Sequence, residues 1–102
     1  MAMDTETSEM DAWVDIDYEQ LPEHLRRAVK VYIEQGRKPG GFLQAVICNL
    51  LMEALGRADE TSRARLHDIV RFFYNEAPPE CWGSLDRMKA WVRRGGLESR
   101  ED

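Results

Sequence analysis

The stretch that decides the fold is Phe42–Leu55, which reads FLQAVICNLLMEAL. Only Gln44, Asn49 and Glu53 interrupt its apolar residues. On a helical wheel nearly every direction is hydrophobic, and this pattern is typical of a helix that neighbouring elements cover on all sides. The sequence therefore predicts one continuous, central and largely buried helix over residues 42–55.

Three amphipathic helices are predicted around this central one, over about residues 22–35, 60–75 and 85–94. Each has an apolar stripe at helical spacing and is bounded by residues that favour helix starts or stops. No repeat and no convincing interior strand accompanies them. The predicted fold is all-α, a compact bundle of about four helices with short loops. The boundary residues, in chain order, are Pro22, Gly36, Asp59, Pro78, Ser84 and Gly95.

The first twenty residues differ in charge from the rest of the chain. The whole chain has 19 acidic and 14 basic residues, and seven of the acids but none of the bases precede residue 21. We therefore predict an acidic, flexible leader over residues 1–20, a helical domain over 21–96 and a frayed tail over 97–102. The acids of the leader are Asp4, Glu6, Glu9, Asp11, Asp15, Asp17 and Glu19.

Aromatic and leader residues are the candidates for contact with another protein. Val14, Ile16 and Tyr18 alternate with acids, as in a short extended segment that needs a surface to lie on. That surface belongs either to a partner or to this protein, with the leader acids against Arg26, Arg27 or Lys30. Trp82 either plugs one end of the bundle or anchors a partner. The candidate protein-binding residues are Trp13, Asp15, Ile16, Asp17, Tyr18, Phe72 and Trp82.

Basic residues gather between positions 26 and 38, where Glu34 is the single acid. A second basic cluster consists of Arg87, Lys89, Arg93 and Arg94. Such clusters can contact the phosphates of a nucleic acid. Glu23 and Arg27, and Lys30 and Glu34, stand four residues apart and are expected to neutralise each other in part, which favours a solvated face. The candidate nucleic-acid-binding residues of this alternative are Arg26, Arg27, Lys30, Arg37 and Lys38.

The sequence offers no constellation for catalysis, and it predicts no cofactor and no metal. His24 and His67 belong to no metal-binding spacing, and Cys48 and Cys81 form no CxxC pair. The glycine-rich residues 36–41 match no phosphate-binding loop. No run of about 20 apolar residues predicts a membrane span, so we expect a cytoplasmic protein. Because the sequence offers no catalytic constellation, we also expect that it is not an enzyme.

Residues 21–96 resemble a family of small, mostly uncharacterised proteins encoded by bacteriophages and prophages of proteobacteria. That family often has an acid directly after the Asn, where this chain has Leu50. The resemblance implies a mobile-element origin and no catalytic residue. The residues that carry it are Pro39-Gly40, Phe42-Leu43, Ala45-Val46, Asn49, Glu53-Ala54, Arg57-Ala58-Asp59, Tyr74-Asn75, Pro78 and Trp82-Gly83-Ser84.

These observations predict a phage-type accessory protein that acts by binding a host protein, either a regulator or a defence component as in anti-CRISPR inhibition. Small size, an acidic charge, spare aromatic residues and the lack of a catalytic constellation all favour this hypothesis. The alternatives are a small nucleic-acid-associated regulator and a structural homo-oligomer that buries the extra apolar face of residues 60–75.

Overall fold

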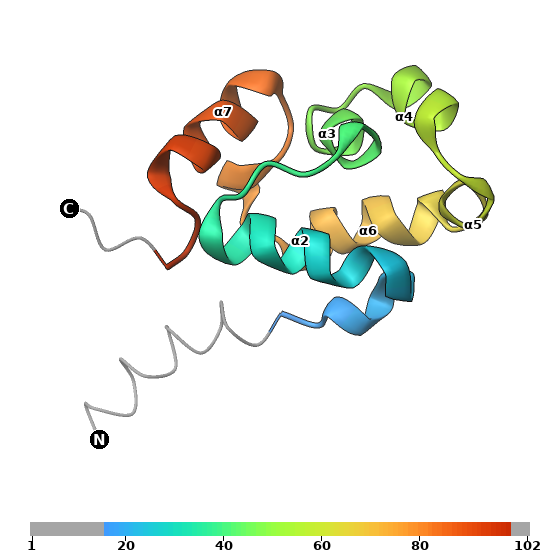
Figure 1. The fold of residues 1–102 in the computed structure, drawn as a ribbon, viewed down its shortest axis with the longest axis horizontal. Helices are drawn as coiled ribbons and strands as arrows, with labels where there is room; N and C mark the ends of the chain where they lie inside the picture. The colour runs from blue at the N-terminus through green and yellow to red at the C-terminus, as the bar shows by residue number, and fades with distance from the viewer. Residues whose placement is uncertain (1–15, 99–102) are drawn as a thin grey trace.

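The computed structural model describes residues 16–98, and Figure 1 shows that they form a helical body. Within them no strand occurs, so the all-α prediction is confirmed. The described residues form six α-helices rather than the expected four. The elements are η1 (Tyr18–Gln20), α2 (Glu23–Gln35), α3 (Gly41–Ile47), α4 (Leu51–Arg57), α5 (Glu60–Ala64), α6 (Leu66–Glu76), η2 (Pro79–Cys81) and α7 (Leu85–Arg94), where η denotes a short 3-10 helix.

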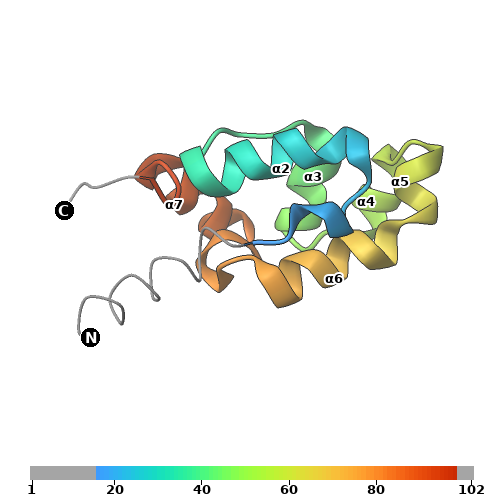
Figure 2. The same cartoon turned by 90° about the horizontal axis from the view of Figure 1, so that it is seen from below.

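α2 and α6 run in roughly the same direction, with η1 between them (Figure 2). Each helix buries one apolar stripe, as its amphipathic pattern predicts. Full burial of a side chain of this size contributes about 1.5–3 kcal/mol. The stripe of α2 consists of Leu25, Val29, Tyr32 and Ile33, and that of α6 consists of Ile69, Phe72 and Phe73.

α7 packs against the carboxyl end of α2. The indole Nε1 of Trp91 donates hydrogen bonds to the carbonyl oxygens of Tyr32 at 3.0 Å and Ile33 at 3.2 Å. Gly36 ends α2 in the left-handed conformation, and the backbone of Gly96 approaches it so closely that a Cβ on Gly96 would stand 2.5 Å from the Gly36 nitrogen. The two hydrogen bonds from Trp91 go to carbonyl groups at the end of α2, where a helix leaves carbonyls without partners of its own.

The helical body extends beyond the predicted domain at both ends. Ile16 is buried in the core, and Tyr18 begins a 3-10 helix instead of an extended segment. The amides of Leu97 and Glu98 donate to Ile33 O at 3.0 Å and Glu34 O at 2.8 Å, so these two residues are not frayed. The predictions for residues 1–15 and 99–102 lie outside the described residues.

The two additional helices arise because two predicted helices are each broken. The predicted helix over residues 60–75 turns at Arg65, which separates α5 from α6 and whose guanidinium binds Asp68 Oδ2 at 2.8 Å and Gln20 O at 3.1 Å. Asp59 caps α5 as expected, since its Oδ1 accepts from the Ser62 amide at 2.7 Å. The central helix over residues 42–55 is broken at Asn49, and this break creates the candidate site.

Candidate functional site

Asn49 stops α3 in the middle of the apolar run. It has a φ of 66°, the left-handed conformation that Asn adopts more readily than other residues with a side chain. The amide of Asn49 donates to Val46 O at 3.0 Å, and the amide of Leu50 donates to Ala45 O at 2.8 Å. This pair of bonds is a Schellman motif, which satisfies the last carbonyls of a helix and reverses the chain.

The break at Asn49 turns apolar side chains outward that a continuous buried helix would have covered. Leu50 is 50% exposed, Leu51 59% and Met52 81%. Ala54 is the one buried residue of α4. The prediction of a helix buried on all sides is therefore wrong for this half of the run.

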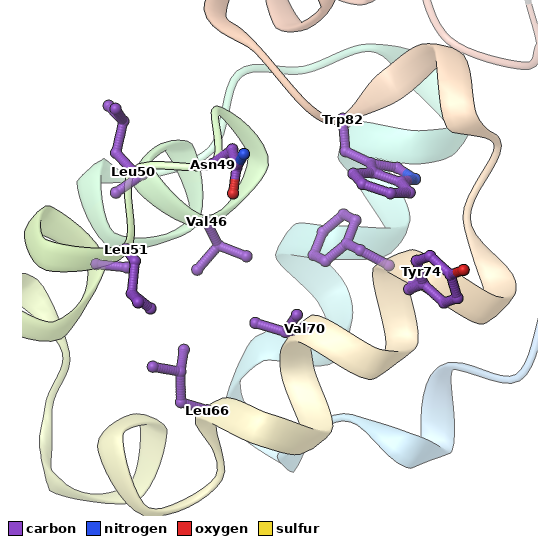
Figure 3. Close-up of a pocket in the computed structure, with 11 residues that line it drawn as sticks. Val46, Asn49, Leu50, Leu51, Leu66, Val70, Tyr74 and Trp82 are labelled. Atoms are coloured by element: carbon purple, nitrogen blue, oxygen red, sulfur yellow. The ribbon is translucent and has the colours of Figure 1, made fainter.

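An apolar groove opens between α3–α4 on one side and α6 on the other, and Trp82 closes one end (Figure 3). Val46 and Leu51 point into it from one wall, and Leu66 and Val70 face them from α6. The cavity volume is about 290 Å³. The lining residues are Ala45, Val46, Asn49, Leu50, Leu51, Ala54, Leu66, Val70, Phe73, Tyr74 and Trp82.

Trp82 and Tyr74 form the aromatic end of the groove. Their ring centroids lie 6.1 Å apart with an angle of 56° between the planes. The loop that carries Trp82 is held to α3 by the amide of Gly83, which donates to Ile47 O at 2.7 Å. Trp82 Nε1 is buried and has no hydrogen-bond partner among the described residues. Tyr74 is 74% exposed, so an occupant of the groove could stack on its ring.

The lining of the groove is mainly apolar. Among the described residues it includes no carboxyl group, basic side chain or thiol, and Tyr74 contributes a phenol hydroxyl. The two cysteines lie elsewhere in the core, and burial raises the pKa of Cys81 to about 12 and raises that of Cys48. Both thiols therefore stay protonated near neutral pH, which is unfavourable for a nucleophile.

The predicted protein-binding residues fall in three places. Trp13 and Asp15 lie outside the described residues. Ile16 is in the core, and the Tyr18 hydroxyl donates to Glu34 Oε2 at 3.1 Å while its ring lies 5.7 Å from that of Phe72. These described residues therefore pack on the protein's own body, which is one of the two alternatives that the sequence leaves open.

Asp17 and Phe72 have structural roles. The Asp17 carboxylate accepts from the Glu19 amide at 3.1 Å and so caps η1. Phe72 is fully buried, so its side chain is not a contact surface, and Tyr74 is the exposed aromatic residue of that run. Of the five predicted protein-binding residues that the structure describes, only Trp82 lines the groove.

The predicted nucleic-acid-binding residues lie on and just after α2. Arg27, Lys30, Arg37 and Lys38 are exposed on one face. Arg26 is different, because its guanidinium donates to the carbonyls of Leu21 at 3.1 Å and Glu19 at 3.3 Å and so holds η1 against α2.

Within residues 16–98, no three His, Cys, Asp or Glu side chains converge in a way that could hold a metal ion. His24 instead contacts Asp59 Oδ2 at 3.1 Å and Ser62 Oγ at 3.2 Å. No helix in this part of the chain has both the length and the apolar character to cross a bilayer.

Sequence reasoning missed the groove because it treated residues 42–55 as one element. Two signals were present. Asn49 is the residue type most suited, after glycine, to a left-handed cap. The run is also apolar on all sides, and a body of this size offers few neighbours to cover such a helix.

No protein-family model, no curated protein and no solved structure matches this chain.

Proposed function

We propose that this protein is a non-catalytic binding module whose groove between α3–α4 and α6 holds an amphipathic helix of a partner protein. The observation that carries the proposal is the concentration of exposed apolar side chains at this groove. Soluble monomers rarely expose contiguous apolar patches larger than a few hundred Å², and larger patches mark interaction sites.

The exposed large apolar residues of the described chain are strongly localised. There are seven of them, and four line the groove, whereas Met52 and Leu55 lie elsewhere on α4 and Leu85 lies on α7. Scattered single apolar residues need no explanation, but a cluster that surrounds a groove favours docking. The four are Leu50, Leu51, Val70 and Tyr74.

The size and chemistry of the groove favour a peptide helix over a cofactor. Its volume of about 290 Å³ is at the lower end of the roughly 300–1,000 Å³ typical of ligand pockets. Helices dock in such grooves through apolar side chains at i, i+3 or i+4, and i+7. Arg63 and His67 are exposed and lie close in sequence to the lining residue Leu66, so a partner helix with an acidic flank would complement them. Arg71 is also exposed, but its guanidinium already contacts Asp68 at 3.4 Å.

The resemblance to phage-encoded proteins supports a bacterial host protein as the partner, including a regulator or a component of host defence such as a CRISPR effector. Binding would inhibit such a target by covering one of its surfaces. The alternative of a structural homo-oligomer would use the same groove, with a second copy of this chain as its occupant.

Affinity capture from bacterial host lysate with matched variants tests the proposal. Val70→Glu places a charge inside the groove at a residue that is 45% exposed, and Leu85→Glu places the same charge at a 49% exposed residue away from it. We expect the first variant to lose the captured partner and the second to retain it, with circular dichroism showing that both are folded.

Two outcomes would overturn the proposal. If both variants retain the partner equally, the groove is not the docking site. If light scattering shows a dimer that Val70→Glu dissociates, the occupant of the groove is a second copy rather than a partner helix. If a partner is captured and Val70→Glu loses it, cross-linking of the purified complex should locate the partner segment against α4 or α6.

A further inference from the structure

One polar atom at the aromatic end of the groove has no partner. Trp82 Nε1 is buried, and within the described part of the chain it donates no hydrogen bond. Buried polar groups in folded proteins are almost always hydrogen-bonded, and this holds for the N–H of a buried Trp. Trp91 follows the rule, because its Nε1 donates to the carbonyls of Tyr32 and Ile33. The exception at Trp82 lies in the groove, so it indicates an acceptor that arrives with the occupant.

The loop at the aromatic end of the groove is fixed by its backbone. The Tyr32 hydroxyl donates to Cys81 O at 2.7 Å, and Arg87 Nη1 donates to Pro79 O at 2.9 Å. The amide of Gly83 adds the bond to α3 described above. Because α2, α3 and α7 all hold this loop, its indole ring does not move to find a partner inside the body.

The position of the indole nitrogen shows how an acceptor reaches it. Figure 3 shows this nitrogen on the Tyr74 side of the Trp82 ring. The face of an aromatic ring accepts hydrogen bonds only weakly, so Tyr74 does not satisfy the donor. The Tyr74 side chain is 74% exposed and therefore turns outward with little loss of buried area. This rotation opens Nε1 to an occupant of the groove.

We propose that Trp82 Nε1 donates a hydrogen bond to a free carbonyl oxygen at the carboxyl end of the docked partner helix. The inference rests on the proposed function and adds the direction in which the partner lies. Only the last four carbonyls of a helix lack an acceptor role within the helix itself, so the interior turns of the partner offer no backbone acceptor. The partner helix therefore has its carboxyl end at Trp82 and its amino end near Leu66.

The opposite end of the groove fits the amino end of a helix. Figure 3 shows Leu66 at that end, and from Leu66 to Tyr74 α6 rises about 12 Å, slightly more than two helical turns. Arg63 and His67 are exposed close in sequence to Leu66, and Arg63 forms no ion pair within residues 16–98. Acidic side chains stabilise the first turn of a helix, so that turn of the partner would bring carboxylates to this cation.

Short helical peptides selected from a phage-displayed library against the full chain provide the probe. We expect selected peptides to have apolar residues at i, i+4 and i+7 and acids in the first turn. Val70→Glu should abolish their binding, since it places a charge in the groove. If no selected peptide depends on Val70, the proposed function fails and this inference fails with it.

Removal of the N–H alone tests the hydrogen bond. Cys81 directly precedes Trp82, so synthetic residues 81–102 can be joined to residues 1–80 by ligation at the Cys81 thiol. With 3-benzothienylalanine in place of Trp82, sulfur replaces the indole N–H and the ring keeps its shape. We expect the affinity for a Val70-dependent peptide to fall about three- to tenfold relative to the ligated chain with Trp82, which corresponds to one net hydrogen bond. The Tm of the free protein should not fall, because the lost donor had no partner.

The same analogue at Trp91 is the matched control. It removes an N–H that is bonded to Tyr32 O and Ile33 O, so it should lower the Tm and leave the affinity for the peptide unchanged. Unchanged affinity of the Trp82 analogue would overturn the proposed hydrogen bond. An equal fall in Tm for the two analogues would also overturn it, because the Trp82 N–H would then be bonded in the free protein.

Photo-cross-linking with a benzophenone group at either end of the peptide tests the direction. Mass spectrometry should locate the carboxyl-terminal label on Trp82 or Tyr74 and the amino-terminal label on α5 or the first turn of α6. The reverse pattern, with Val70 still required for binding, would overturn the direction and leave the proposed function intact.

Discussion

α2 and the segment from α3 to α4 are both helical and of similar length, yet they use their apolar residues in opposite ways. α2 has a polar face and a single apolar stripe, and it buries that stripe in 13 uninterrupted residues. The segment over residues 41–57 is apolar in nearly every direction, and it stops at Asn49 and exposes three consecutive large side chains. A helix stays whole and covered when its apolar arc matches the surface that its neighbours offer.

The comparison also separates two reasons why an apolar residue occurs in a small domain. Along α2 such a residue contributes to the stability of the fold through burial. Along α4 the large apolar residues are exposed and contribute little to the fold, and the proposed binding role rests on this exposure.

Truncation of a large apolar side chain should lower the free energy of unfolding much more in α2 than in α4. Ile33→Ala in α2 removes a fully buried side chain and is expected to lower the free energy of unfolding by about 2–5 kcal/mol. Leu51→Ala in α4 removes a largely exposed one and should change it by no more than about 0.5 kcal/mol. Urea denaturation followed by circular dichroism measures both. Equal losses would mean that α4 is buried in solution.

Exchange of the residues that end α2 and α3 should reveal two kinds of helix stop. Gly36→Asn brings a Cβ to 2.7 Å from the Gly96 nitrogen, and overpacking of this kind is expected to cost about 1–3 kcal/mol. Asn49→Gly keeps the left-handed conformation at an exposed position, so relief of side-chain strain and the larger backbone entropy of glycine should nearly cancel.

Thermal unfolding of both exchange variants gives the measurement. Comparable destabilisation by the two would show that the close approach of Gly96 does not distinguish α2 from α3. A large loss for Asn49→Gly alone would show that the Asn side chain, rather than its backbone conformation, holds the break.

A fall in pH should lower the free energy of unfolding through α5 and α6, by less than the substitutions above. Hydrogen bonds from the Ser62 amide and from Arg65 hold the pKa values of Asp59 and Asp68, respectively, below their usual range. A lowered folded-state pKa adds stability that is complete above the unfolded value of about 3.9 and is lost as pH falls through the folded value. Both carboxylates are exposed to solvent screening, so the contribution is modest.

Chemical denaturation between about pH 7 and pH 2.5 checks this acid dependence. Asp68→Asn should have a shallower decline of stability below about pH 4 than the unmodified chain, because Asn does not titrate. If the stability of Asp68→Asn declines below about pH 4 as steeply as that of the unmodified chain, Arg65 does not favour the ionised form of Asp68.

The sequence predicted the fold class and several boundaries because those depend on local chemistry. Ser84 and Gly95 bound α7 where expected, since a side-chain oxygen at the start and a left-handed glycine at the end act within one helical turn. The same local patterns predicted Asp59 as the start of α5 and Gly36 as the end of α2. It did not find the turn at Arg65, whose side-chain contact with the Gln20 carbonyl spans 45 positions of the chain.

The candidate site was harder to predict than the fold. Trp82 was identified because a large ring in a turn must either fill a space or make a contact, and it lies at the end of the groove. Leu51 belongs to the run that the sequence predicts to be buried, and Leu66 and Val70 belong to the apolar stripe of residues 60–75. Periodicity does not state how much of such an apolar arc the neighbours cover. Phe72 was identified as a contact residue for the same reason, although Tyr18 and Phe73 surround it.

The amino-acid sequence by itself determined that this chain is helical, where α2 and α7 begin and end, and which residues are apolar. Only the tertiary structure decided that residues 42–55 are two helices, that a groove opens between α4 and α6, and that Arg27 and Lys30 lack ion-pair partners in the described chain. Helix caps act over one turn, so they can be predicted locally. Burial and ion pairing depend on which distant surfaces meet, and the packing of the whole body sets that.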